Sequence, residues 1–203
     1  MSTSASSIRS RPRRGFTLVE TTISMGVLAI LMVGVLSALM LSRRMTEGSI
    51  YQNSALTIIQ GYIEQMKNME FASLPYTNSS GTVFAGTGVN AYDVPTRLDE
   101  STTDVLQISP AAIPALSGIT PGVTPTGIRD NIKLIDINQT PSNTNDDLRL
   151  NIWAWVQDIT DASVDATQVR AITFIYQWQN NDGSRSRPYK GTVRTIRSAV
   201  MTL

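Results

Sequence analysis

Residues 14–42 read RGFTLVETTISMGVLAILMVGVLSALMLS, and this stretch decides the fold. The 22 residues from position 21 to position 42 carry no charged side chain. A helix of that length rises roughly 33 Å at about 1.5 Å per residue, which is enough to cross the apolar core of a bilayer, about 30 Å thick. We therefore predict a transmembrane helix over residues 16–42, ended by the charged pair Arg43 and Arg44.

Four arginines, at positions 9, 11, 13 and 14, precede this helix, and no acidic residue accompanies them. Because basic flanks stay on the cytoplasmic side, the N-terminus should be cytoplasmic and the C-terminal part should lie outside the cytoplasm. Loss of these four arginines from a chain of net charge +1 would leave a chain of net charge −3.

The composition excludes several classes of enzyme. The 203 residues include no Cys and no His. Disulfides, cysteine-ligated zinc, thiol catalysis, Ser-His-Asp triads and HExxH zinc sites are therefore excluded. We expect no enzymatic activity, no cofactor and no metal. The near balance of 17 basic and 16 acidic residues also argues against nucleic acid as a partner.

Two ordinary explanations of the apolar segment compete. A secretory signal peptide has an apolar region of about 7–15 residues followed by a small-x-small cleavage site. The segment here is longer, and no clear A-x-A site follows it. A single-span anchor for an extracytoplasmic, β-rich, ligand-binding domain remains the alternative.

The residues at the start of the helix favour a third explanation. A basic leader, then Gly15, then FTLVE at positions 16–20, then an uncharged helix follow one another. This order resembles the processing site of type IV pilins and type II secretion pseudopilins. The resemblance implies that a membrane-embedded prepilin peptidase removes the leader, residues 1–15, by cutting between Gly15 and Phe16, and that the new amino group of Phe16 is N-methylated. It also implies three further partners: other pilin or pseudopilin subunits, an inner-membrane assembly platform and membrane lipid.

Glu20 supports the same interpretation on physical grounds. A carboxylate within an apolar membrane helix costs roughly 2.5–3.5 kcal/mol unless it is paired. No Lys or Arg lies within the following helical turn, and Arg14 would leave with the leader. The remaining cation is the new amino group of Phe16, in the same chain or in a neighbour. We expect this pairing to register each incoming subunit; the alternative is a Glu20 solvated by lipid headgroups.

Residues 43–74 are expected to continue the helix outside the membrane. Leu56, Ile59, Ile63 and Met66 follow spacings of three, four and three residues, which is one face of an amphipathic helix. Pro75 should end the helix, with residues 71–74 as its last turn.

Residues 75–147 contain many Pro and Gly residues and are predicted to be loop-rich. The resemblance implies that this insertion between stem and sheet is the variable part of the protein. Short strands are predicted over 105–109 and 132–137. The nearly uncharged stretch 110–127 reads as a long loop, where we would look for subunit-specific contacts.

Residues 148–203 are predicted to form an antiparallel sheet. Apolar and polar residues alternate over 148–157 and 171–178, and a third extended run covers 193–203. The sequence NNDG at 180–183 predicts a turn, so that the last two strands form a hairpin. The tryptophan-bearing strands are similar in arrangement to minor pilins of the V type and pseudopilins of the I type.

Two further features of this region have alternative interpretations. Trp153, Trp155 and Trp178 are either structural aromatics or a platform for a carbohydrate or protein partner. Six aspartates offer carboxylates for calcium, as in some pseudopilins, but without EF-hand spacing. These aspartates stand at positions 146, 147, 158, 161, 165 and 182.

The sequence thus predicts an α+β, pilin-like protein with a long N-terminal helix packed on a small C-terminal antiparallel sheet. The expected location is the bacterial inner membrane, with one span and, after assembly, a filament. The expected function is that of a structural minor subunit of a type IV pilus or of a type II secretion pseudopilus.

Overall fold

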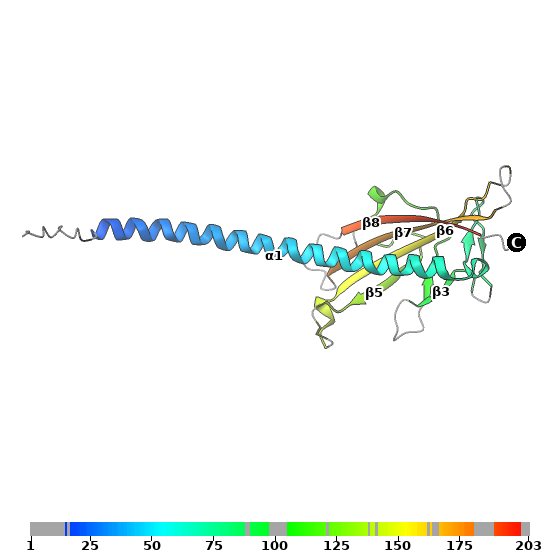
Figure 1. Ribbon diagram of the computed structural model, residues 1–203, viewed down its shortest axis with the longest axis horizontal. Coiled ribbons are helices and arrows are strands. Elements are labelled where there is room, and N and C mark those ends of the chain that lie inside the picture. Colours follow the sequence, from blue (N-terminus) through cyan, green and yellow to red (C-terminus); the bar gives the residue numbers. More distant parts are fainter. Residues whose placement is uncertain are drawn as a thin grey trace, which may run out of the picture. The chain divides into compact units, whose positions relative to one another are not determined.

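The computed structural model describes residues 15, 17–87, 90–97, 105–120, 122–137, 139–140, 142–161, 163, 167–180 and 189–199 (Figure 1). The chain divides into two compact units, Met1–Gly48 and Ser49–Leu203. Helix α1, Leu18–Asn68, contributes its first part to one unit and its last part to the other.

The first unit consists of the apolar part of α1. This helix is long and apolar enough to cross a membrane, and its most apolar window buries no residue within the protein. Every side chain of residues 18–47 is exposed. An all-apolar helix without a protein partner is what a bilayer, rather than water, would stabilise.

The last part of α1 packs in the second unit through one face. Its buried residues are Ala55, Ile59, Tyr62, Ile63 and Met66, which confirms the predicted amphipathic helix. The predicted last turn was wrong: α1 ends at Asn68, and Phe71–Ser73 form a separate 3-10 helix, η1. The break lies at Glu70, whose extended backbone (φ −59°, ψ 137°) interrupts the helical hydrogen bonds.

The main sheet has the order β2-β1-β6-β7-β8, and β5 also pairs with β6. The strands are β1 (Tyr76–Thr77), β2 (Val83–Phe84), β5 (Asn131–Ile135), β6 (Leu148–Asp158), β7 (Val169–Asn180) and β8 (Tyr189–Ser198). All of these pairs are antiparallel except β1 with β6. Strands β3 (Asp93–Arg97) and β4 (Val105–Gln107) form a separate two-stranded sheet. The α+β fold with a mostly antiparallel sheet is as predicted.

The predicted hairpin of the last two strands is confirmed, with different bounds. Strand β7 pairs antiparallel with β8 from Val169 opposite Ser198 to Trp178 opposite Tyr189. Strand β8 therefore begins four residues before the predicted run at position 193. Most of the predicted turn, residues 181–183, and the last part of the predicted run, residues 200–203, lie outside the described residues.

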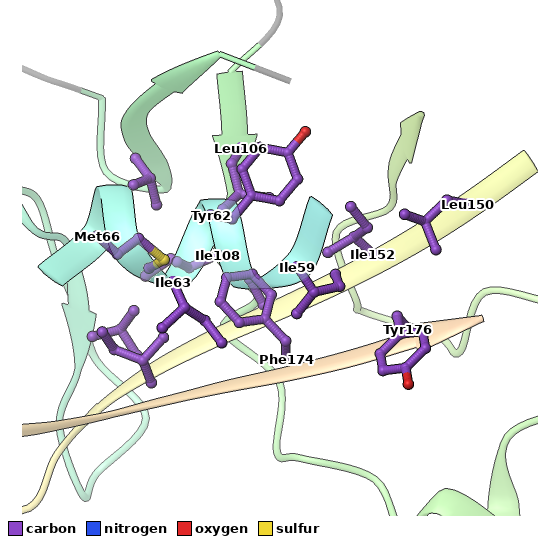
Figure 2. Packing of buried hydrophobic residues seen from close by; sticks show 14 of the residues in the cluster. Ile59, Tyr62, Ile63, Met66, Leu106, Ile108, Leu150, Ile152, Phe174 and Tyr176 are labelled. Carbon is purple, nitrogen blue, oxygen red and sulfur yellow. The ribbon is translucent and has the colours of Figure 1, made fainter. Parts of the chain in front are cut away.

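The main core lies between α1 and one face of the sheet. Figure 2 shows Ile59 and Ile63 of α1 among Ile152 of β6 and Phe174 of β7, and these side chains belong to one buried cluster. Trp178 lies in the same cluster, with its ring 5.7 Å from that of Tyr51 in an edge-to-face contact. Contacts between strand residues and the helix face hold this end of α1 on the sheet.

The opposite face of the sheet carries a smaller core around Trp153 and Trp155, which are only 1% and 2% exposed. The segment 110–128 covers it with Ile113, Leu116, Ile119 and Ile128. Trp155 Nε1 donates a 2.9 Å hydrogen bond to the carbonyl oxygen of Ala111. The structural interpretation of the tryptophans is confirmed, because buried rings offer no platform to a ligand.

Candidate processing and assembly site

The helix begins with a side-chain cap at Thr17. The Glu20 backbone N–H donates to Thr17 Oγ1 at 3.3 Å, and the Thr21 backbone N–H donates to the Thr17 carbonyl oxygen at 3.2 Å. These two bonds define Thr17 as the N-cap of α1. The sequence analysis missed this role, although Thr17 and Glu20 have the T-x-x-E spacing of a capping box.

Gly15 lies before this cap, outside the helix, and it is exposed. A Cβ atom added at Gly15 would meet no described atom within 4 Å. The described fold therefore does not require glycine here, so the requirement would come from a partner that closes around the chain. Phe16, the expected methylated residue, lies outside the described residues.

Glu20 lies in the first turn of α1, where its negative charge interacts favourably with the partial positive charge of the helix N-terminus. It is exposed, and no basic side chain in the described part of the chain forms an ion pair with it. The next cation along the helix, Arg43, is roughly 34 Å away at about 1.5 Å per residue. Glu20 is therefore available to a cation supplied from outside the described residues.

The hydroxyl groups next to Glu20 and in the middle of the apolar segment are satisfied within the helix. The hydroxyl groups of Thr21, Thr22 and Ser24 donate to the carbonyl oxygens of Leu18, Val19 and Glu20 at 2.8, 2.9 and 2.7 Å. Ser37 donates to the carbonyl oxygen of Val33 at 2.9 Å. Such bonds let hydroxyl groups enter an apolar medium, which leaves Glu20 as the charged side chain of this segment that needs a partner.

The surface of the segment beyond Glu20 is apolar. A shallow recess is lined by Leu28, Leu31, Met32, Val35 and Leu36. Its lining offers no polar atom to a ligand, so it suits a lipid chain or another apolar helix.

The aspartates considered for calcium are not gathered into a site within the described residues. No group of three acidic or other metal-ligating side chains occurs there. Asp161 is exposed and accepts hydrogen bonds from the hydroxyl and the backbone N–H of Ser163, which lower the pKa of its carboxyl group. Asp165, Asp182 and the side chain of Asp146 lie outside the described part.

Comparison with known proteins identifies the N-terminal segment. Residues 10–36 match the family model described as the prokaryotic N-terminal methylation motif. No curated protein matches the chain, and neither does any solved structure. Residues 10–36 therefore carry the leader signature that type IV pilins and pseudopilins share.

Proposed function

We propose that this protein is a structural minor subunit of a type IV pilus or of a type II secretion pseudopilus. The observation that carries the proposal is the order of three features: the methylation motif at residues 10–36, the helix cap at Thr17, and the acid Glu20 in an apolar helix, with which no described basic side chain pairs. Residues 1–15 are the leader, 16–42 the stem and 43–74 its amphipathic continuation. Residues 75–147 are the variable region, and 148–203 carry the sheet.

Processing would begin with the chain inserted once in the inner membrane. The arginines ahead of Gly15 hold the N-terminus in the cytoplasm, and residues beyond the stem lie in the periplasm or outside the cell. The prepilin peptidase cuts between Gly15 and Phe16 and methylates the amino group of Phe16. Removal of the four arginines takes away the charges that hold the N-terminus at the cytoplasmic surface.

Assembly would then depend on Glu20. Its carboxylate attracts the positive amino group of Phe16 on an adjacent subunit, and this attraction is strong where water is scarce. Pairing with that amine also removes the cost of an isolated charge in an apolar medium. Because the hydroxyl groups next to Glu20 are already satisfied, Glu20 sets the axial position at which one stem stops against the next.

The rest of the stem would supply contact area without further specificity. Its exposed Leu, Val, Ile and Met side chains pack against neighbouring stems or lipid. Within the bilayer this packing depends on close van der Waals contact rather than on release of water. Other pilin or pseudopilin subunits and the inner-membrane assembly platform are the partners of this step.

Mass spectrometry of the mature N-terminus tests the proposal. In cells that contain the prepilin peptidase, we expect a chain that begins at Phe16 and carries one added methyl group, and in cells without it an intact leader. Gly15→Val should retain the leader because a branched side chain does not fit a narrow cleft. Gly26→Val, in the apolar helix, is the matched control and should be cleaved normally. An intact leader in the presence of the peptidase, or cleavage after the apolar segment, would contradict the proposal.

A further inference from the structure

Strand β8 forms one border of the main sheet (Figure 1). It is ten residues long, and its pairing with β7 runs without a bulge from one end to the other. Among the described residues, no strand pairs with its other side. A long, regular edge strand of this kind is a template for a further strand.

The register shows which backbone groups face that open side. The Ala199 backbone N–H donates to the carbonyl oxygen of Gln168 at 2.8 Å. Since hydrogen-bonded pairs alternate along an antiparallel ladder, the backbone groups of residues 197, 195 and 193 also face β7. The backbone N–H and C=O groups of Thr192, Arg194, Ile196 and Ser198 then point away from β7. We call these four residues the free edge.

The side chains of the free edge are exposed as well. Ile196 is 60% exposed, more than the exposed apolar strand residues Ile132 and Leu134, at 42% and 43%. The beginning of β8 is different, because Lys190 Nζ donates a 3.0 Å hydrogen bond to the carbonyl oxygen of Ile119. The open part of β8 is therefore its second half.

The charge on β8 is one-sided. The strand contains Lys190, Arg194 and Arg197 and no acidic residue. Lys190 is bound to Ile119, and Arg197 donates to the carbonyl oxygens of Met66 and Met69. Arg194 is exposed and forms no ion pair within the described part of the chain. The free edge thus presents backbone hydrogen-bonding groups, one available cation and one apolar side chain.

We propose that the free edge binds an extended segment of a partner protein, which adds to the sheet as a further strand. The segment carries a carboxylate opposite Arg194 and an apolar, β-branched residue opposite Ile196, because such cross-strand pairs are favourable. A second copy of β8 fits less well, since the strand offers no carboxylate to Arg194 and antiparallel pairing about Thr195 makes the two Arg194 side chains diagonal neighbours. The proposal goes beyond the proposed function and does not depend on leader cleavage.

Two synthetic peptides test the chemistry of the partner. Both have ten residues that alternate Thr and Val, and they differ at one central position, which is Glu in one and Lys in the other. With the full chain in detergent micelles, we expect the Glu peptide to bind at least tenfold more tightly than the Lys peptide. Binding should slow amide exchange at Thr192, Arg194 and Ile196 and leave Val193 and Thr195 unchanged, because their N–H groups already bond to β7.

Two variants separate the backbone contribution from the charge. Ile196→Pro removes an outward N–H group while leaving the pairs with β7, a position where an edge strand tolerates proline; we expect at least a tenfold loss of binding, and none in the control Ile196→Val. Arg194→Glu should reverse the preference, so that the Lys peptide binds more tightly. Arg194→Glu leaves the backbone unchanged, so it still tests the charge preference of the free edge if Ile196→Pro fails to fold.

Three results would overturn the proposal. The first is equal binding of the two peptides to the wild-type chain. The second is unchanged binding of the Glu peptide to a folded Ile196→Pro variant. The third is a wild-type dimer, seen by analytical ultracentrifugation without peptide, that Ile196→Pro dissociates, because the occupant of the edge would then be a second copy.

Discussion

Arg170 of β7 donates a 2.6 Å hydrogen bond from Nη1 to the carbonyl oxygen of Leu74, which lies 96 positions earlier in the chain. The same nitrogen donates to the carbonyl oxygen of Phe71, also at 2.6 Å. The guanidinium carbon lies 4.1 Å from the ring centroids of both Phe71 and Tyr76. A strand residue thus satisfies carbonyl groups just beyond the end of α1, where the helix itself offers no partner.

Arg197 of β8 has the same function one turn earlier. Its Nη1 donates to the carbonyl oxygen of Met66 at 2.6 Å, and its Nη2 donates to that of Met69. Burial lowers the pKa of both guanidinium groups, yet arginine remains charged at neutral pH because its ordinary pKa is so high. Two cations at the C-terminal end of a helix also interact favourably with the partial negative charge of the helix dipole there.

Arg170→Met should lower the free energy of unfolding by about 3 kcal/mol, because two carbonyl groups lose a charged donor in a place that water reaches poorly. Urea denaturation of the full chain in detergent, followed by circular dichroism, measures the change. Arg194→Met is the matched control, and as an exposed substitution it should stay within about 0.5 kcal/mol of the wild type. Equal losses in the two variants would show that the hydrogen bonds of Arg170 contribute nothing specific.

Gly191→Ala should destabilise the sheet through Tyr176, its partner in β7. An added Cβ atom would lie 2.5 Å from the Tyr176 hydroxyl oxygen, so the buried ring would have to move. We expect a loss of about 1–3 kcal/mol, as for other overpacked cores. Gly61→Ala, where nothing lies within 4 Å, should instead stabilise the helix by up to about 1 kcal/mol.

A double-mutant cycle tests the cause. On a Tyr176→Ala background the ring is absent, so Gly191→Ala should lose most of its cost. If the losses of the two substitutions simply add, the ring is not the source of the destabilisation.

Asp130→Ala should loosen the segment 110–128 from the tryptophan face. The carboxylate accepts hydrogen bonds from Trp153 Nε1 at 3.0 Å and from Thr124 Oγ1 at 2.7 Å. Without it the indole N–H of Trp153 loses its partner, at a cost of about 1–3 kcal/mol. We expect faster exchange of that indole proton and a red shift of tryptophan fluorescence. Asp136→Ala, at an exposed position, should change neither signal.

The spacing of apolar residues along the sequence predicted the helix and the long strands, in which buried positions recur at a regular interval. The spacing of Ile59, Ile63 and Met66 marked the buried face of α1, and the alternation in β6 and β7 marked the strands. Strands β1 and β2 have two residues each, too few to show a period, and β3 is interrupted by a shift of register. None of these three was predicted.

Contacts between distant residues were beyond the sequence pattern. In the sequence, Arg170 and Asp130 cannot be distinguished from ordinary surface charges. Their hydrogen bonds to Leu74 and Trp153 exist only in the folded chain. The leader signature was predictable because its residues stand at fixed spacing along one segment, and residues 10–36 match the methylation motif. The cap at Thr17 was predictable too, since Thr-x-x-Glu before an apolar run is a local signal of a helix start.

Thr17→Val should weaken the start of α1, because valine has the shape of threonine without the oxygen that accepts from the Glu20 N–H. Loss of a cap costs about 1 kcal/mol, so amide exchange at Glu20 should be roughly fivefold faster in micelles. Thr17→Ser keeps the acceptor and should behave like the wild type. If Thr17→Ser instead exchanges faster while Thr17→Val behaves like the wild type, the methyl group rather than the oxygen determines the helix start.

Glu20→Ala should leave leader cleavage largely intact and block incorporation into the filament. The proposed cut, between Gly15 and Phe16, lies before the start of α1 at Leu18, whereas assembly in our proposal requires the carboxylate to meet the amino group of Phe16 on an adjacent subunit. In the variant, the positive amino group of Phe16 on the adjacent subunit would be left unpaired, and an unpaired charge in an apolar medium costs about 3 kcal/mol or more. Co-purification with filament subunits should therefore fall roughly a hundredfold. Glu47→Ala removes the same charge from an exposed position farther along α1 and should incorporate normally. Mass spectrometry of the N-terminus checks cleavage in both variants, and normal co-purification of the Glu20→Ala chain would leave the carboxylate without a role in assembly.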